Sequence, residues 1–153
     1  MLASALTLAA AFIPQEPSPG IDRELARARA ATVQDVEYDL RFALGDRLDA
    51  VSGSISMRFQ FRETGARAPL ILDFDGASIS DVTVNNRPVE LERRFNHLVI
   101  PAELLGDGVN GVTANFTSAV APTGTPLTVY RDQADGQEYY YCLLYTSDAA
   151  DEV

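Results

Sequence analysis

Hydrophobic and polar residues alternate with a period of two along most of the chain. Between Val33 and Leu44, the apolar residues Val36, Tyr38, Leu40 and Phe42 are separated by charged ones. Because successive side chains of a β-strand point to opposite faces, this pattern predicts a strand with one wet face. We expect the four apolar side chains to point into a core.

The next segment, Val51–Phe61, repeats the pattern. Its expected inward residues are all apolar: Val51, Ile55, Met57, Phe59 and Phe61. The short polar break at Gly45-Asp46 joins the two segments, so we expect a long antiparallel hairpin. Gly53 lies inside the second strand and marks a bulge or a close approach of another chain segment.

Further strands are expected at roughly even spacing, separated by Asn, Asp, Gly and Pro: Leu70–Phe74, Ile79–Val84, Pro88–Leu91, Leu98–Ile100, Val112–Val120, Leu127–Tyr130 and Glu138–Tyr141. Asn85-Asn86, Phe95-Asn96 and Asp135-Gly136 are typical of hairpin turns, the last of them a two-residue turn. Helix is expected only at Ile21–Ala31, with Asp22 as N-cap, and as one turn at Pro101–Leu105. The pattern predicts an all-β fold, an antiparallel β-sandwich or related open barrel with a short N-terminal helix.

The chain begins with an apolar stretch, Leu2–Ile13, followed by a Pro-rich linker that ends at Gly20. Twelve residues are too few to cross a bilayer, which needs roughly 20, so no stable membrane span is expected. Small residues at its end favour a secretory signal, although no basic residue precedes it. We therefore interpret residues 1–20 as leader and linker of an exported protein, periplasmic or secreted. A plain buried or disordered leader on a cytoplasmic protein is the alternative.

Charge and composition narrow the function further. The chain has 22 acidic and 12 basic residues, a formal net charge of −10, and such a surface repels nucleic acid. Cys142 is the single cysteine, which excludes an intrachain disulfide and a cysteine-based metal site. The single histidine, His97, has no second histidine nearby and is expected to be a surface or turn residue rather than a metal ligand.

No standard catalytic motif occurs in the sequence: there is no His-rich metal spacing, no Gly-x-Ser-x-Gly and no phosphate-binding Gly loop. The acidic residues Asp73, Asp75 and Asp81 lie near strand ends, where Asp is common for hydrogen-bonding reasons. The Asp132–Asp135–Glu138 turn is a weak calcium candidate, but an ordinary acidic turn is favoured. Asn115-Phe116-Thr117 matches a glycosylation sequon within a predicted strand. No catalytic, substrate-binding or metal-binding residue is assigned.

Five motifs in a fixed order resemble the N-terminal domain of the aminopeptidase N family of zinc metallopeptidases. They are Tyr38–Leu40 (Y-x-L), Ile71–Phe74 (ILDF), Val82–Asn86 (V-x-V-N-x), Ile100 to Asn110 (I-P-x-x-x-L-x-x-G-x-N) and Arg131 to Tyr141, with Asp132, Asp135, Gly136, Tyr139 and Tyr141. The resemblance covers about residues 20 to 141. Tyr130-Arg131 stands where the family has Arg-Phe, and Gln133 replaces a proline.

This resemblance implies that residues 21–141 are the β-sandwich N-terminal domain of a zinc-dependent aminopeptidase, which removes N-terminal residues from peptides. The family's Gly-x-Met-Glu-Asn segment and its His-Glu-x-x-His zinc motif belong to the next domain and do not occur here. The implied partners are therefore the missing catalytic domain and, in the parent enzyme, zinc and a peptide substrate. This chain alone is expected to be inactive and to bind no metal.

The sequence leaves the family pattern at Cys142. The eleven residues Cys142–Glu152, CLLYTSDAADE, resemble the translation of a transposon-derived sequencing adapter. We therefore expect residues 142–153 to be a non-native tail on a truncated chain. Two alternatives remain from sequence: a free-standing exported β-sandwich that binds protein or carbohydrate, and a paralogue of the peptidase whose zinc motif has decayed.

Overall fold

The computed structural model describes residues 19–20, 23–44, 49–63, 68–120 and 127–142 of the 153-residue chain. In these ranges one helix, α1 (Arg23–Thr32), precedes ten strands. The strands are β1 (Val33–Ala43), β2 (Ala50–Phe61), β3 (Leu70–Asp73), β4 (Ser78–Val84), β5 (Arg87–Pro88), β6 (Glu92–Arg94), β7 (His97–Ile100), β8 (Gly108–Ala119), β9 (Leu127–Arg131) and β10 (Glu138–Cys142), and a 3₁₀ turn, η1 (Ala102–Leu104), lies between β7 and β8. The all-β prediction and the short helix are confirmed.

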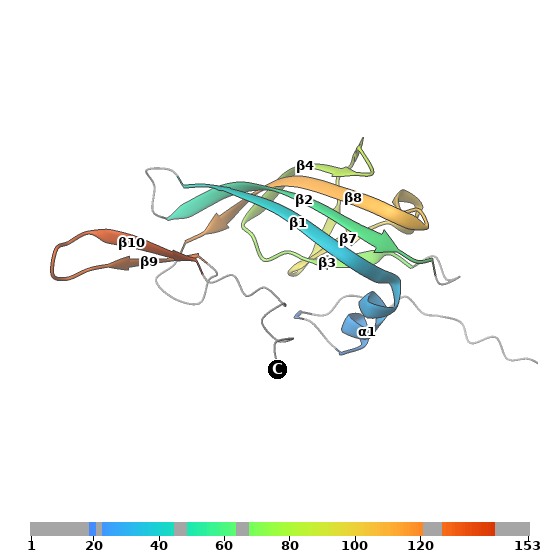
Figure 1. Ribbon diagram of the computed structural model, residues 1–153, viewed down its shortest axis with the longest axis horizontal. Coiled ribbons are helices and arrows are strands. Elements are labelled where there is room, and N and C mark those ends of the chain that lie inside the picture. Colours follow the sequence, from blue (N-terminus) through green and yellow to red (C-terminus); the bar gives the residue numbers. More distant parts are fainter. Residues whose placement is uncertain (1–18, 21–22, 45–48, 64–67, 121–126, 143–153) are drawn as a thin grey trace, which may run out of the picture.

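The strands form three antiparallel sheets, which Figure 1 shows as two layers and a projecting hairpin. The large sheet has five strands in the order β1-β2-β8-β4-β5, and the second has three in the order β3-β7-β6. The third is the two-stranded pair β9 and β10. The expected β1–β2 hairpin is confirmed, with Leu40 opposite Ile55 and Phe42 opposite Gly53.

The core lies between the five-stranded and the three-stranded sheets. Its fully buried cluster comprises Met57, Phe59, Val84 and Val112 from the large sheet and Leu70 and Ile100 from the small one. Phe59 is 1% exposed, and Val84 and Ile100 are 0% exposed. Burial of apolar surface is the dominant favourable term in folding, so this cluster is the main source of the domain's stability.

The expectation that the apolar residues of β1 point into the core is wrong. Val36, Tyr38, Leu40 and Phe42 are 40–61% exposed, and of the described residues of β1 only Val33 packs against the core cluster. The period of two places these side chains on the face of the sheet that carries the core. However, β1 is the edge strand of the large sheet, and the smaller sheet does not cover it.

Two other sequence expectations are refined by the backbone. Asn85 and Asn86 have positive φ angles of 51° and 63°, as the predicted primed turn requires. The return strand is shorter than expected: its register with β4 covers Arg87 and Pro88, and the Val89 amide adds one hydrogen bond to the Val82 carbonyl. Gly53 is a close-approach position: a Cβ there would clash with the carbonyl oxygen of Arg41.

Asp22, most of the leader and the tail beyond Cys142 fall outside the described residues, so the N-cap and the proposed boundaries stay predictions. Cys142 itself pairs with Leu127 at the end of β10. In the described ranges, no helix is both long and apolar enough to cross a membrane.

Candidate functional site

The terminal hairpin, formed by β9 and β10, is closed by a four-residue loop. The Asp132 amide donates to the Gln137 carbonyl at 2.8 Å, and the Gly136 amide donates to the Asp132 carbonyl at 2.9 Å. The predicted two-residue turn at Asp135-Gly136 is therefore wrong. A type I′ turn needs a positive φ at both central residues and a type II′ turn at the first, but of Asp135 and Gly136 only the second, Gly136 at 72°, has one.

The aspartates of this loop stabilise it. Asp132 Oδ1 accepts a hydrogen bond from the Ala134 amide, and Asp135 Oδ1 accepts one from the Gln137 amide, each at 2.8 Å. The Tyr139 hydroxyl donates to Asp135 Oδ2 at 2.8 Å. The hydrogen bonds from the Gln137 amide and the Tyr139 hydroxyl lower the pKa of Asp135. The hydrogen bond between Tyr139 and Asp135 also raises the pKa of Tyr139.

These contacts favour the ordinary acidic turn over the calcium candidate, since the carboxylate oxygens already accept local donors. Within the described residues, no group of three or more His, Cys, Asp or Glu side chains is arranged to hold a metal ion. The hairpin also exposes three aromatic side chains: Tyr130, Tyr139 and Tyr141.

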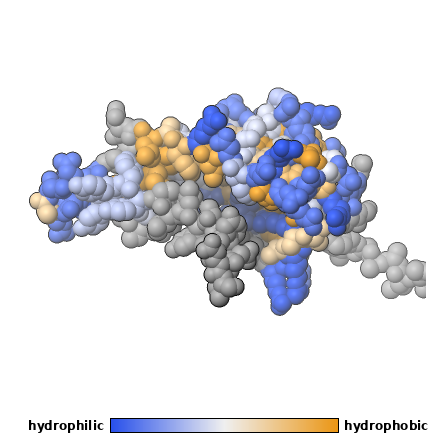
Figure 2. Space-filling model, in the orientation of Figure 1, coloured by the Kyte–Doolittle hydropathy of each residue, from blue (hydrophilic) through white to orange (hydrophobic). Residues whose placement is uncertain are grey.

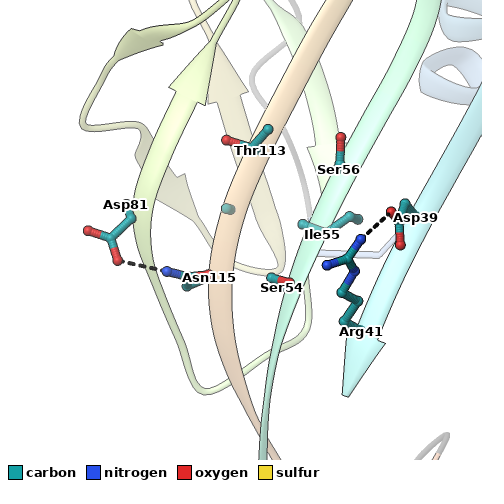
Figure 3. A pocket seen from close by; sticks show the side chains of 9 residues that line it. Asp39, Arg41, Ser54, Ile55, Ser56, Asp81, Thr113 and Asn115 are labelled. Carbon is teal, nitrogen blue, oxygen red and sulfur yellow. Dashed lines mark hydrogen bonds and ion pairs between the residues drawn. The ribbon is translucent and has the colours of Figure 1, made fainter. Parts of the chain in front are cut away.

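A shallow polar trough lies on the face of the large sheet that points away from the core (Figure 3). Its volume is about 290 Å³. The rows of side chains run across the strands: Arg41 lies opposite Ser54, and Ser54 opposite Asn115. At its two sides, Arg41 pairs with Asp39 at 3.2 Å and Asn115 donates to Asp81 at 2.9 Å.

The residues that line this trough can form hydrogen bonds with a ligand. Its lining residues offer hydroxyl, amide and carboxylate groups, and the single cation among them, Arg41, is already paired. The arrangement contains no histidine or cysteine to act as base or nucleophile. Asp81 contacts Asn115 and Ser80, and Asp75 is exposed. The trough is thus a solvated sheet face rather than a catalytic cleft.

The single histidine is buried, and the expectation of a surface residue is wrong. His97 is 0% exposed. Its Nε2 lies 3.0 Å from the Gly20 carbonyl oxygen, and its Nδ1 lies 2.9 Å from Asp73 Oδ1. Asp73 also accepts two hydrogen bonds from Arg29 of α1, at 2.6 and 2.7 Å. The cluster therefore attaches the helix and Gly20 to the sandwich, which is a structural role.

Replacing Asp73 by asparagine is expected to lower stability by about 1 kcal/mol near neutral pH, because the ion pair is partly exposed. The Arg29 hydrogen bond holds the pKa of Asp73 below its usual 3.8. This stabilisation is therefore complete above pH 3.8 and disappears as the pH falls through the lowered value. Urea unfolding of both proteins between neutral and acid pH measures it.

Asp81→Asn is the matched control, since Asp81 is exposed and, within the described part of the chain, accepts from Asn115 and Ser80 rather than from a cation. A difference between Asp73→Asn and the parent chain that persists unchanged at low pH contradicts this role of the carboxylate.

Asn110 has a buried hydrogen-bonding role that was not predicted from the sequence. It is 1% exposed. Its side-chain oxygen accepts from Asn85 Nδ2 and the Gly106 amide, and its Nδ2 donates to the carbonyls of Gly106 and Gly108, at 2.8–3.0 Å. The signal was present, because Asn85 and Asn110 are the asparagines of two separate family-like motifs. The structure brings the two motifs into contact.

Comparison with known proteins extends this picture. No family model and no curated protein matches the chain. Chains of solved structures do match, among them native leukotriene A4 hydrolase from Saccharomyces cerevisiae, with a TM-score of 0.55 and 17% sequence identity. The match covers 72% of this chain and 19% of that one, so this chain spans less than a fifth of the hydrolase. At this identity the likeness shows a common fold.

Proposed function

We propose that this chain is the N-terminal, substrate-side β-domain of an exported zinc aminopeptidase, and that it is inactive without the catalytic domain. The observation that carries the proposal is the fold shared with part of leukotriene A4 hydrolase, a member of the gluzincin aminopeptidase family. That fold was expected from the motif order alone. A sequence resemblance and a structural likeness therefore point to the same family.

The motif residues support the proposal by their positions. Ile100 is a core residue with no exposed surface, and Gly108 has a φ of 97° that other residues rarely adopt. Asn85 and Asn110 bond to each other, and Asp135 and Gly136 build the terminal loop. These residues form turns and buried contacts that the fold requires. Their order along the chain is therefore expected to be characteristic of the fold.

In the proposed parent enzyme, a zinc ion would supply an activated water for hydrolysis of the first peptide bond, with a glutamate of the missing domain as general base. The described residues provide no donor set for that ion, so the proposal assigns it to the missing catalytic domain. The contribution of this chain is to wall one side of the cleft, with its terminal hairpin nearest to the peptide's amino end.

The tail is part of the same proposal. We infer that the natural sequence is replaced from Cys142 onward, directly before the residue that in the family helps to hold the substrate's amino group. The nucleotides that encode residues 142–152 are expected to spell the adapter. A codon series for the same amino acids that differs from the adapter contradicts this inference.

The purified 153-residue chain is expected to release no amino acid from aminoacyl-p-nitroanilide substrates, with or without added zinc. The reason is that the described residues offer no group of three or more potential metal ligands, so the zinc chemistry of the proposed enzyme has no donor set among them. The control is a commercial zinc aminopeptidase under the same conditions. Metal-dependent turnover that follows the chain through purification contradicts the assignment of catalysis to another domain.

A further inference from the structure

The apolar face of β1 is without a covering element in the described structure. Five apolar residues at every second position are 40–61% exposed: Val36, Tyr38, Leu40, Phe42 and Leu44. We call them the β1 stripe. Figure 2 shows apolar surface gathered where the large sheet approaches the projecting hairpin. Contiguous exposed apolar residues on a soluble protein usually mark an interaction surface.

The backbone of β1 is open to a partner as well. β1 is the edge strand, with β2 as its one neighbour among the described strands. A long, unprotected edge strand is a template for pairing with another chain. The pairing of β1 with β2 is irregular between Gln34 and Glu37, where Asp35 has a φ of 50°. The regular part therefore runs from Glu37 to Ala43. Leu40 is the middle residue of this part and of the β1 stripe.

We propose that this edge binds a second copy of the chain, with the two β1 strands antiparallel and Leu40 opposite Leu40 of the other copy. The paired sheets then form one continuous ten-stranded sheet, twice the five strands of one copy. In this register Tyr38 lies opposite Phe42 and Val36 opposite Leu44. Directly opposed residues point to the same face, so the two stripes join into one apolar surface.

Charge complementarity selects this register. With Leu40 at the two-fold axis, Asp39 of each copy lies opposite Arg41 of the other, which gives two favourable pairs. A shift that centres Tyr38 instead places Glu37 opposite Asp39, which gives two like-charge pairs. In that shift Asp35 would face Arg41, but Asp35 lies in the irregular part of β1 and is not in regular register. A shift that centres Phe42 leaves Arg41 opposite Ala43 and loses both pairs. Shifting one β1 strand by an odd number of residues against the other is excluded, because the apolar residues of one copy would then lie opposite polar residues of the other.

The edge is self-complementary, as an isologous two-fold interface requires. Asp39 and Arg41 already lie 3.2 Å apart within one copy, so the pairing extends an existing ion pair into a ring of four alternating charges. This inference uses β1 alone and does not depend on the proposed function.

Sedimentation equilibrium of the 153-residue chain tests the proposal. We expect a concentration-dependent mass that approaches twice 16.6 kDa. Leu40→Lys places two like charges at the axis and should weaken self-association at least about tenfold. Val109→Lys is the matched control, because Val109 is also exposed and apolar (53%) but lies on β8, and it should associate like the parent chain. A monomer at all concentrations, or equal association of both variants, overturns the proposal.

Charge reversal tests the register. Asp39→Arg and Arg41→Asp each place like charges opposite one another, so each variant alone should be monomeric. Their mixture restores both opposite-charge pairs and should form a heterodimer. Circular dichroism establishes that both variants are folded. Association of either folded variant alone at parental strength, or failure of the mixture to associate, overturns the Leu40-centred pairing.

Discussion

Replacing Phe59 by alanine is expected to lower the free energy of unfolding by about 4 kcal/mol, the typical result of removing a buried aromatic ring. Phe59 is 1% exposed and lies in the cluster that joins the two sheets. The space left by the ring cannot be filled without moving both sheets, since core residues are close-packed. Urea unfolding followed by circular dichroism measures the change.

Phe95→Ala is the control for Phe59→Ala. Phe95 occupies the β6–β7 turn with 64% of its surface exposed, so its replacement should change stability by less than about 0.5 kcal/mol. The backbone at Phe95 also has a positive φ of 53°. Alanine at this position would keep the same backbone conformation and lack only the ring. Equal losses of stability for the two variants contradict a core between the five-stranded and three-stranded sheets.

Asn110→Ala should destabilise the domain by about 3 kcal/mol, because it leaves several buried polar groups without partners. The variant removes four hydrogen bonds, including the one from Asn85 that links the β4–β5 turn to β8. We expect the amides of Gly106 and Gly111 to exchange with solvent faster than in the parent chain, since the Asn85 side chain accepts from the Gly111 amide. Hydrogen exchange by mass spectrometry measures this local effect beside the global one.

Asn115→Ala is the matched control for Asn110→Ala, since Asn115 lies on the same strand but is exposed, and its side chain donates to Asp81. Its loss should cost less than about 0.5 kcal/mol. Asn110→Asp separates the two sides of the amide, because aspartate can still accept from Asn85 but cannot donate to the Gly106 and Gly108 carbonyls. A stability loss below that of Asn115→Ala contradicts the structural role of Asn110.

Local patterns predicted the strands well because strand signals depend on neighbours in sequence. The alternation in Val51–Phe61 matches the observed burial of Val51, Met57 and Phe59, and the asparagine pair at the β4–β5 turn adopts the expected positive φ angles. These features need only period two and turn chemistry. The antiparallel sandwich follows from their number and spacing.

The errors arose where the answer depends on what lies across the sheet. The pattern of β1 is that of a half-buried strand, but no period reveals that the covering sheet stops short of an edge. His97 was misplaced for the same reason, since its partners Asp73 and Gly20 are distant in sequence. The terminal turn was misjudged because Asp132 and Asp135 cap a longer loop with their side chains, an arrangement that competes with a primed turn.

The sequence identity to the matching hydrolase is 17%, and yet the motifs can be recognised in the sequence. The contacts of the motif residues explain why. In this chain the motif residues occupy turns and core sites, such as Gly108, Asn110 and Ile100. The exposed faces can vary freely around them, because surface substitutions change stability little. Such positions identify a fold, whereas activity depends on groups in another part of the proposed parent protein.

The most direct test of the central claim is the nucleotide sequence of the uninterrupted gene downstream of Tyr141, read from the source DNA. The proposal predicts that the reading frame continues from Tyr141 into a Gly-x-Met-Glu-Asn segment and a His-Glu-x-x-His motif with a downstream glutamate. A stop codon shortly after Tyr141 would contradict the proposal and favour a free-standing binding module. An open frame in which the zinc motif has decayed would contradict the assignment of aminopeptidase activity to the parent protein.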